Sequence, residues 1–416
     1  MSVPALPAPA WLRRPSAVAL GVVGLAAFVW LVPLQLGWYG GGSLGDVPLY
    51  QDVAARMASG DVPYRDFALE YPPGAAAVFL AAWPWPGSYS LAFSGLMLAC
   101  LVITALLVMG SARALGLDGR RVAVAGMSVV FAPLLLGSFL ETRFDLALAA
   151  ALAAVFYGAT TKRFGLMWGA LAVAVLIKLV PLALIPALFF YHRHARGARA
   201  ASLGAGLGLA AVALVFAPFV ALSARGTFAL AEYHLDRPLQ IESTGAAVLH
   251  GLNQVGVVTL DVTTSFGSQN LVGSAPDVVS AISSVLAIVL VGVIVAILAV
   301  RLPGTSAPED ARLLILACAG TLVALLVTGK VLSPQFLVWL LPVALLIPGA
   351  KGLRVGALVM LAFLLTQAYF TALYWDLVAL EAGPVWLLVV RDVVLVALLV
   401  AIWPRTTEAA SQEPPS

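Results

Sequence analysis

Apolar stretches of bilayer-spanning length recur along most of this chain, and they constrain its fold more than any other feature. A run of about 20 apolar residues crosses the hydrocarbon core of a membrane as a helix. Of the 416 residues, 62% are hydrophobic and only 10% are charged, which is far less charge than a soluble domain carries. The sequence therefore predicts an all-α protein that crosses the membrane many times.

Twelve stretches have a suitable length and composition for such helices. They lie near residues 17–36, 88–110, 122–139, 145–160, 164–177, 178–191, 200–221, 278–300, 311–328, 334–349, 355–374 and 384–403. Lys178, Pro181 and Pro186 interrupt 164–191, which fits two short helices or one long kinked helix. We therefore expect a multi-span membrane domain over 17–404, with terminal segments 1–16 and 405–416 and two long outer loops, 37–87 and 222–277.

The basic residues are distributed unevenly between the two sides of this topology. If the N-terminus is cytoplasmic, most of the 23 basic residues fall in inner connections, as Arg120, Arg193 and Lys351 do. This is the usual positive-inside bias, and two separate helices over 164–191 keep it in phase. Most acidic residues fall on the outer side. We expect a multi-pass protein of the plasma membrane with both termini in the cytoplasm and its chemistry at the outer face.

The first outer loop contains two helical patterns that are too short to cross a membrane. Apolar residues recur at helical spacing over 47–59, so a helix here would lie flat on the bilayer. Apolar residues after Pro73 run to Trp85 and predict an interfacial or re-entrant helix, with Trp83 and Trp85 at the level of the lipid headgroups.

Asp46 precedes the first of these helices, and its position allows two interpretations. A carboxylate before Pro48 can cap a helix, because its oxygen accepts from free amide groups of the first turn. A carboxylate at the membrane surface can also act as a general base that takes a proton from a hydroxyl nucleophile. The two roles are compatible.

Other ionisable residues lie near the outer ends of the predicted spans, where a charge beside hydrocarbon is costly. Glu141, Arg143 and Asp145 occupy one short turn and fit either a mutual ion-pair cluster or a ligand site. Lys178 and Lys330 fit either lysines that extend to the headgroups or cations that bind a phosphate.

Three further polar groups each have a structural interpretation beside a functional one. Glu70 before Tyr71-Pro-Pro73 fits a rigid junction. The stretch from His234 to Ser243 contains Arg237, Gln240 and Glu242 and fits either a ligand site or an ordinary polar loop. Arg391 and Asp392 are adjacent on a helix, so we expect each to pair with another helix rather than with its neighbour.

Several classes of function lack a signal in the sequence. There is no phosphate-binding glycine loop, dinucleotide fingerprint or zinc-protease motif, and a net charge of +3 gives no argument for a nucleic-acid partner. No cofactor is predicted, although Glu141 and Asp145 leave a divalent metal possible without requiring it. An outer-face enzyme without nucleotides must take an activated substrate from the membrane, and a lipid-linked phosphate fits that need.

Five segments carry a resemblance to a known family, and they follow one another from the first outer loop to residue 340. They are Asp46-Val-Pro-Leu-Tyr50, Gly60-Asp-Val-Pro-Tyr64, Glu70-Tyr-Pro-Pro73, Lys178-Leu-Val-Pro-Leu182 and Lys330-Val-Leu-Ser-Pro-Gln-Phe-Leu-Val-Trp-Leu340. Together with Asp236–Ser243, they resemble the GT-C superfamily of polytopic glycosyltransferases, and within it family 87, which uses polyprenyl-phosphate mannose.

The resemblance implies an inverting hexosyl transfer, with Asp46 as the base. The donor would be a polyprenyl-phosphate sugar, mannose being favoured, and the acceptor a glycolipid, polysaccharide or protein. We expect the donor phosphate to be bound by Lys330, Lys178, Arg143 and Arg237. We expect sugar or acceptor contacts from Tyr50, Glu70, Tyr71, Glu141, Asp145, His234, Gln240, Glu242 and Gln335.

A secondary transporter or a flippase for lipid-linked sugars is the main alternative, because twelve spans with both ends inside also suit a carrier. The polar residues here gather on one side, next to two long loops, and this favours an enzyme.

Overall fold

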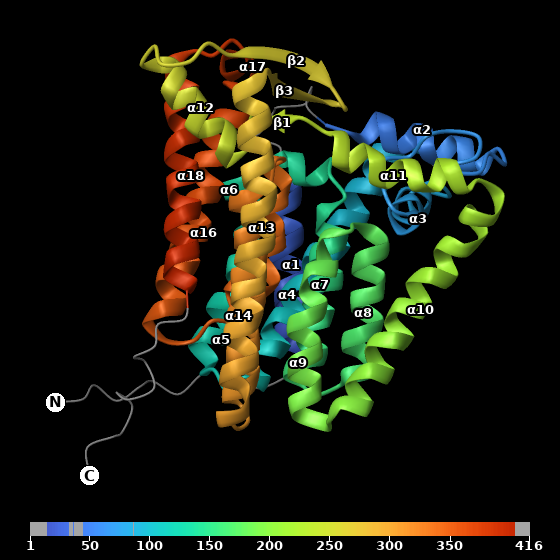
Figure 1. The fold of residues 1–416 in the computed structure, drawn as a ribbon. Helices are drawn as coiled ribbons and strands as arrows, with labels where there is room; N and C mark the ends of the chain where they lie inside the picture. The colour runs from blue at the N-terminus through green and yellow to red at the C-terminus, as the bar shows by residue number, and fades with distance from the viewer. Residues whose placement is uncertain (1–14, 33–35, 37–44, 86, 404–416) are drawn as a thin grey trace.

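The computed structural model describes residues 15–32, 36, 45–85 and 87–403, and this part of the chain is almost wholly helical (Figure 1). Most helices run side by side as a bundle: α1 (Pro15–Leu31), α4 (Tyr89–Ala114), α5 (Gly119–Phe131), α6 (Pro133–Leu136), α7 (Asp145–Thr160), α8 (Phe164–Ile177), α9 (Ile185–Arg196), α10 (Ala198–Leu222), α13 (Ser274–Arg301), α14 (Glu309–Thr328), α15 (Leu341–Ala344), α16 (Gly349–Phe370) and α18 (Ala382–Ile402).

Shorter elements gather at the upper end of the bundle in Figure 1, which we call the sheet end. They are α2 (Val47–Ala58), α3 (Pro73–Ala81), α11 (Ala224–Asp236), α12 (Thr244–Gln254), α17 (Tyr374–Val378) and strands β1 (Leu239–Gln240), β2 (Asp261–Ser265) and β3 (Ser268–Val272). Within the described residues, four 3-10 segments join these elements: η4 (Ser138–Glu141), η5 (Val180–Leu184), η6 (Leu302–Gly304) and η7 (Pro334–Leu340).

Six helices of the described chain are long and apolar enough to cross a membrane: α4, α10, α13, α14, α16 and α18. The protein is therefore a membrane protein of the all-α class. Each of the other predicted stretches also contains helical residues, but as shorter segments such as α7, α8 and the run η7–α15. The count of twelve crossings stays a prediction.

Residues 164–191 form two helices and not one kinked helix. Helix α8 ends at Ile177, and Lys178 has an extended backbone with φ −156° and ψ 142°. Pro181 then lies in the first turn of η5 and Pro186 in the first turn of α9. Proline is tolerated at these positions because the first amide groups of a helix have no partner within it.

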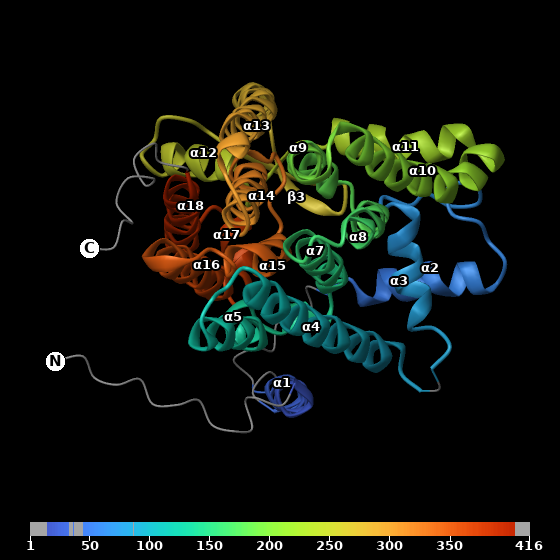
Figure 2. The same cartoon turned by 90° about the horizontal axis from the view of Figure 1, so that it is seen from below.

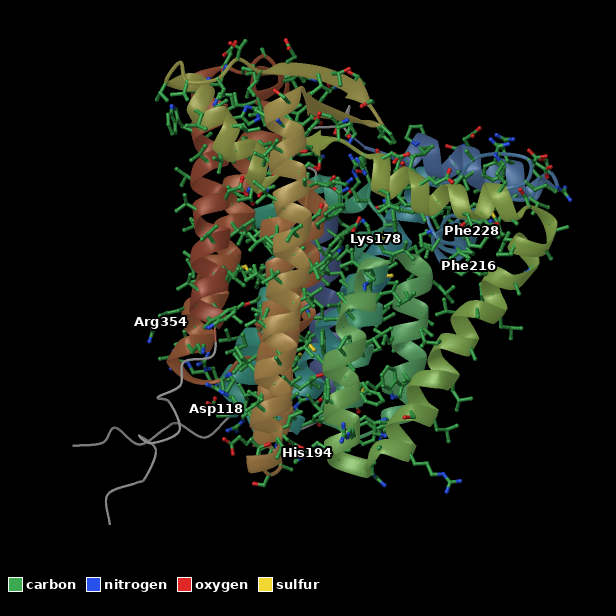
Figure 3. All side chains as sticks on the ribbon, viewed as in Figure 1. Asp118, Lys178, His194, Phe216, Phe228 and Arg354 are labelled. Atoms are coloured by element: carbon green, nitrogen blue, oxygen red, sulfur yellow. The ribbon has the colours of Figure 1, made fainter. Side chains whose placement is uncertain are left out.

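The two sides predicted from charge correspond to the two ends of the bundle. Asp118, His194 and Arg354 lie near Arg120, Arg193 and Lys351 in the sequence, which were assigned to the inner side, and all three are at the end opposite the sheet (Figure 3). The segments assigned to the outer side, α2, α3, α11 and α12, lie at the sheet end (Figure 1).

The centre of the bundle is α7, which Figure 2 shows among α4, α8 and α15. Nearly all of its residues are buried, and many are alanine. Small residues let helix backbones approach closely, which is how helices associate within a lipid environment. Gly158 is a clear case, since a Cβ there would lie 2.6 Å from the backbone nitrogen of Met167 in α8.

The first outer loop folds largely as predicted. Helix α2 covers 47–58, and its buried Val47, Tyr50 and Ala54 share one face. The Tyr50 ring stacks on Phe79 of α3 with 4.2 Å between ring centroids. Helix α3 approaches α8 at Gly74, where a Cβ would lie 2.6 Å from the Leu176 carbonyl. These contacts hold α2 against the bundle and place Asp46 at the sheet end.

The second outer loop contains structure that the sequence analysis did not predict. Its strands form a small antiparallel sheet in the order β1-β3-β2. Phe266 and Gly267 connect β2 to β3 and have φ values of 51° and 65°. Two successive residues with positive φ form the tight turn that matches the twist of a hairpin.

Candidate functional site

A cavity of about 760 Å³ lies at the sheet end and is lined by segments from residue 45 to residue 375. Its size is within the range of small-molecule sites. It brings together almost every residue that the sequence analysis proposed for the site: Asp46, Tyr50, Glu70, Tyr71, Arg143, Lys178, His234, Arg237, Gln240, Glu242, Lys330 and Gln335. Glu141, in η4, does not line it, and Asp145 lies behind the wall, where it contacts two lining side chains.

Asp46 precedes α2, but its side chain does not cap the helix. The carboxylate instead forms an ion pair with Arg143 and accepts a hydrogen bond of 3.3 Å from the Tyr50 hydroxyl. The capping interpretation is therefore wrong for the side chain. Because Tyr50 is held by the α2–α3 contact, the carboxylate has a fixed direction at the cavity wall.

Arg143, which we expected to bind phosphate, lies beside the candidate base. A guanidinium next to a carboxylate favours the charged form of that carboxylate, which is the form that can accept a proton. The same charge weakens the carboxylate as a base. The arrangement therefore fits an orienting role for Arg143 as well as a contact to an anionic ligand.

Lys178 is held by Asp145 and by aromatic rings. Its ammonium lies 2.9 Å from Asp145 Oδ1, and the indole nitrogen of Trp339 donates to the same oxygen at 2.8 Å. The rings of Phe144, Phe336 and Trp339 lie 4.0 to 5.2 Å from this ammonium, distances typical of cation–π contacts. With 15% of its side chain exposed, Lys178 does not extend to the headgroups, so that alternative is wrong.

Two further cations line the wall near the hairpin. Lys330 Nζ donates to the backbone oxygen of Leu235 at 2.5 Å, and Arg237 Nη2 donates to Ser268 Oγ at 3.0 Å. Burial lowers the pKa of Lys330, which Asp236 opposes. Both side chains line the cavity and are held by neutral oxygens through these contacts, so each still offers positive charge to an anionic ligand.

Glu70, Tyr71 and His234 line another part of the wall. Burial and then the nearby Glu70 carboxylate raise the pKa of Tyr71 well above its usual range. Burial and then Arg237 lower the pKa of His234, so this imidazole is neutral at physiological pH.

Gln240 and Glu242 form a buried polar group that closes off one side of the cavity. Gln240 Oε1 accepts from the Leu332 amide at 2.8 Å, and its Nε2 donates to Glu242 Oε2 at 3.2 Å. Tyr369 donates to Glu242 Oε1 at 2.9 Å. Burial raises the pKa of Glu242 to about 7, and Arg391 and the Tyr369 hydrogen bond partly oppose it.

Arg391 and Asp392 pair with each other, contrary to the prediction. The Arg391 Nε lies 3.1 Å from Asp392 Oδ1, because the long arginine side chain reaches the neighbouring carboxylate. Each also contacts another segment as expected: Arg391 Nη2 donates to the Glu242 carbonyl at 2.6 Å, and Thr244 donates to Asp392 at 3.1 Å. This network ties α18 to the β1–α12 connection.

The lining residues that were not predicted include ten that are aromatic or in the hairpin: Tyr233, Thr264, Phe266, Ser268, Gln269, Phe336, Trp339, Phe370, Tyr374 and Trp375. Phe336 and Trp339 were within a recognised motif, whereas α17 is five residues long and gives no periodic signal. For metals, the described ranges hold no group of three or more His, Cys, Asp or Glu side chains that could bind an ion.

The fold and the cavity together define a helical membrane protein with a ligand-sized site at one end of its bundle. A comparison with protein-family models finds none that matches the chain, and a comparison with curated proteins finds no match either.

Proposed function

We propose that this protein is a polytopic glycosyltransferase of the GT-C type. It would move a sugar, mannose being favoured, from polyprenyl phosphate to an acceptor hydroxyl at the outer face of the plasma membrane. The observation that carries this proposal is the lining of one cavity by the Asp46 carboxylate and by Lys178, Arg237 and Lys330, from segments far apart in the chain.

In the proposed mechanism, an acceptor oxygen attacks the anomeric carbon while Asp46 takes the hydroxyl proton. The bond between that carbon and the donor phosphate oxygen breaks, and its electron pair leaves on the phosphate, so the anomeric configuration inverts. Negative charge grows on the phosphate in the transition state, and Lys330 and Arg237 stabilise it there more than in the ground state. The ion pair with Arg143 holds the Asp46 carboxylate in position.

Part of the cavity wall is apolar and suits a lipid-borne donor. Leu179, Val180 and Leu182 of the η5 region and Leu325 and Leu326 of α14 line it. An isoprenoid chain is a branched hydrocarbon, so burial against such side chains is favourable, at about 25 cal/mol for each Å² of apolar surface removed from water. The phosphate at its end would then meet Lys178, at the junction of this wall with the polar part.

A carrier for lipid-linked sugars is the second candidate, and one observation favours it. The helical structure is interrupted between α8 and α9 at Lys178, and again between α14 and η7 at 329–333. Transporters bind their substrates at interrupted helices of this kind. Residues of α2, α11 and the hairpin nevertheless line the cavity, and these elements lie at the sheet end. This position favours a reaction at one face of the membrane over movement of a substrate across it.

The test uses purified protein in detergent with a polyprenyl-phosphate sugar and a panel of acceptor alcohols. A transferase consumes the donor and forms glycoside without any sealed compartment. A carrier leaves the donor intact in detergent and moves it only across the membrane of a vesicle, and that pair of results would replace the enzyme proposal with the carrier.

A further inference from the structure

The mouth of the cavity carries an exposed aromatic residue that the proposed mechanism does not use. Trp375 in α17 lines the cavity and is 60% exposed. Tyr374 packs edge-on against it with 5.4 Å between ring centroids, and Phe370 lies 5.4 Å from Tyr374. A row of rings therefore runs from the end of α16 to the mouth. A large exposed ring inside a cavity gains most from a ligand that covers it.

The β2–β3 hairpin contributes uncharged polar side chains to the same cavity. Thr264, Ser268 and Gln269 line it, and Thr264 Oγ1 donates to Gln269 Oε1 at 3.0 Å. The hairpin is held at its tip, where the Tyr233 hydroxyl of α11 donates to the Phe266 carbonyl at 2.8 Å. Figure 1 shows the hairpin and α17 together at the sheet end, above the bundle.

Aromatic faces combined with hydroxyl and amide groups are the chemistry that recognises a saccharide. The C–H face of a pyranose ring packs on an indole or phenol ring, and its hydroxyls exchange hydrogen bonds with uncharged donors and acceptors. The amide of Gln269 can give up its contact with Thr264 and bind two neighbouring hydroxyls instead. Of the cations assigned to the donor phosphate, Arg237 donates to Ser268 of this hairpin at 3.0 Å, so the polar side chains of the hairpin lie next to the phosphate-binding part of the cavity.

We propose that Trp375, Tyr374, Thr264 and Gln269 form a saccharide-binding subsite, so that the acceptor is a hydroxyl of a glycan and not of a protein or a simple lipid. This inference rests on the glycosyltransferase proposal for its role in acceptor binding. It assigns the acceptor to the solvent-facing mouth and leaves the apolar wall to the donor.

The first experiment measures binding without turnover. The Asp46→Asn protein in lipid nanodiscs is titrated with methyl α-mannoside, methyl β-glucoside and methyl β-galactoside, and with α-linked and β-linked disaccharides of the same three sugars. Saturation-transfer NMR measures the binding. We expect saturation of the ring C–H protons of at least one saccharide. The double variant Asp46→Asn with Trp375→Ala should bind that saccharide about tenfold more weakly than Asp46→Asn alone. Trp375→Tyr in its place should restore most of the binding, because the saccharide packs on the face of an aromatic ring.

Trp85→Ala is the matched control. Trp85 is 68% exposed and does not line the cavity, so its removal leaves saccharide binding unchanged. Thermal unfolding confirms that each variant is folded. The inference is overturned if none of the saccharides binds, or if Trp375→Ala binds as well as its parent.

A second experiment separates this inference from the proposed function. Transfer to a serine peptide or a simple alkyl alcohol, with no transfer to any saccharide, overturns the acceptor assignment and leaves the glycosyltransferase proposal standing. Saccharide binding that depends on Trp375, with no donor consumption for any acceptor, overturns the glycosyltransferase proposal and leaves the subsite. Donor consumption with a saccharide acceptor whose KM rises about tenfold in Trp375→Ala supports both.

Discussion

Lys178 and Asp145 form a buried ion pair of 2.9 Å that joins the C-terminal end of α8 to the first turn of α7. Trp339 adds a third segment by donating to the same carboxylate oxygen. The side chain of Asp145 is 1% exposed, so neither charge could remain there without the other. The pair therefore fixes the position of the cation at the cavity wall and the shape of the wall around it.

A double-mutant cycle tests this relationship. Asp145→Leu or Lys178→Met alone leaves a buried charge without its partner, and each should lower the free energy of unfolding by about 3–5 kcal/mol. The double variant should recover most of that loss, because an apolar pair of similar volume replaces the ion pair, yet it should stay inactive because the cation is gone. The measurements are denaturant-induced unfolding in detergent and donor consumption.

The exposed pair of Arg65 and Asp66 is the control for that cycle. Its removal should leave the free energy of unfolding nearly unchanged, because exposed ion pairs contribute little to stability. A double variant of Lys178 and Asp145 whose destabilisation equals the sum of the single values would show that the two side chains do not stabilise each other.

The pH dependence of stability should carry a signature of Glu242. Burial raises its pKa from 4.5 to about 7, so the folded protein binds a proton that the unfolded chain has already released between these values. Stability is then lost as pH rises from about 4.5 to about 7 and levels off above that, with a total on the order of 3 kcal/mol.

Glu242→Gln keeps an acceptor for Tyr369 but cannot ionise, so the variant should lack this fall. Thermal unfolding in detergent at a series of pH values gives the comparison. The difference in stability between Glu242→Gln and the parent should grow in favour of the variant from pH 4.5 to pH 7. A difference that is constant over this window contradicts the assignment.

The close approach of α3 to α8 gives a prediction about a residue outside the cavity. A Cβ at Gly74 would lie 2.6 Å from the backbone of Leu176, so Gly74→Ala must push α3 outward. Overpacking of this kind costs about 1–3 kcal/mol. Because Phe79 of α3 supports Tyr50, and Tyr50 donates to Asp46, the variant should also lower turnover.

Gly95→Ala in α4 is the matched control, since a Cβ there meets nothing within 4 Å. It should leave the turnover of donor unchanged and should not lower the unfolding temperature, because alanine is favoured over glycine inside a helix. Equal effects of the two substitutions would mean that the α3–α8 contact does not position the site.

Local pattern was sufficient to predict several elements of the fold. The helical spacing of Leu49, Tyr50, Val53, Ala54 and Met57 predicted α2 within one residue of its observed end. Tyr50, Val53 and Ala54 are buried as this spacing indicates, whereas Leu49 is exposed. The prolines at 181 and 186 predicted an interruption between α8 and α9. Ionisable residues beside apolar runs identified the charged side chains of the cavity wall, because such charges are retained near hydrocarbon only with partners or ligands.

Pairings between distant segments could not be predicted. Nothing local distinguishes Arg143 as the partner of Asp46, or Asp145 as the partner of Lys178, because these contacts depend on how the helices pack. The hairpin and α17 were missed for a different reason. Strands of two to five residues and a five-residue helix are shorter than the windows in which periodicity is visible.

The most direct test of the glycosyltransferase account compares Asp46→Asn with the parent in the detergent assay of donor consumption. The account predicts that the variant folds and still binds polyprenyl-phosphate sugar, but transfers it at least about 100-fold more slowly, because amide replaces the proton acceptor. Asp52→Asn, on an exposed position of the same helix, should retain full activity. Transfer by Asp46→Asn at the rate of the parent would contradict the account.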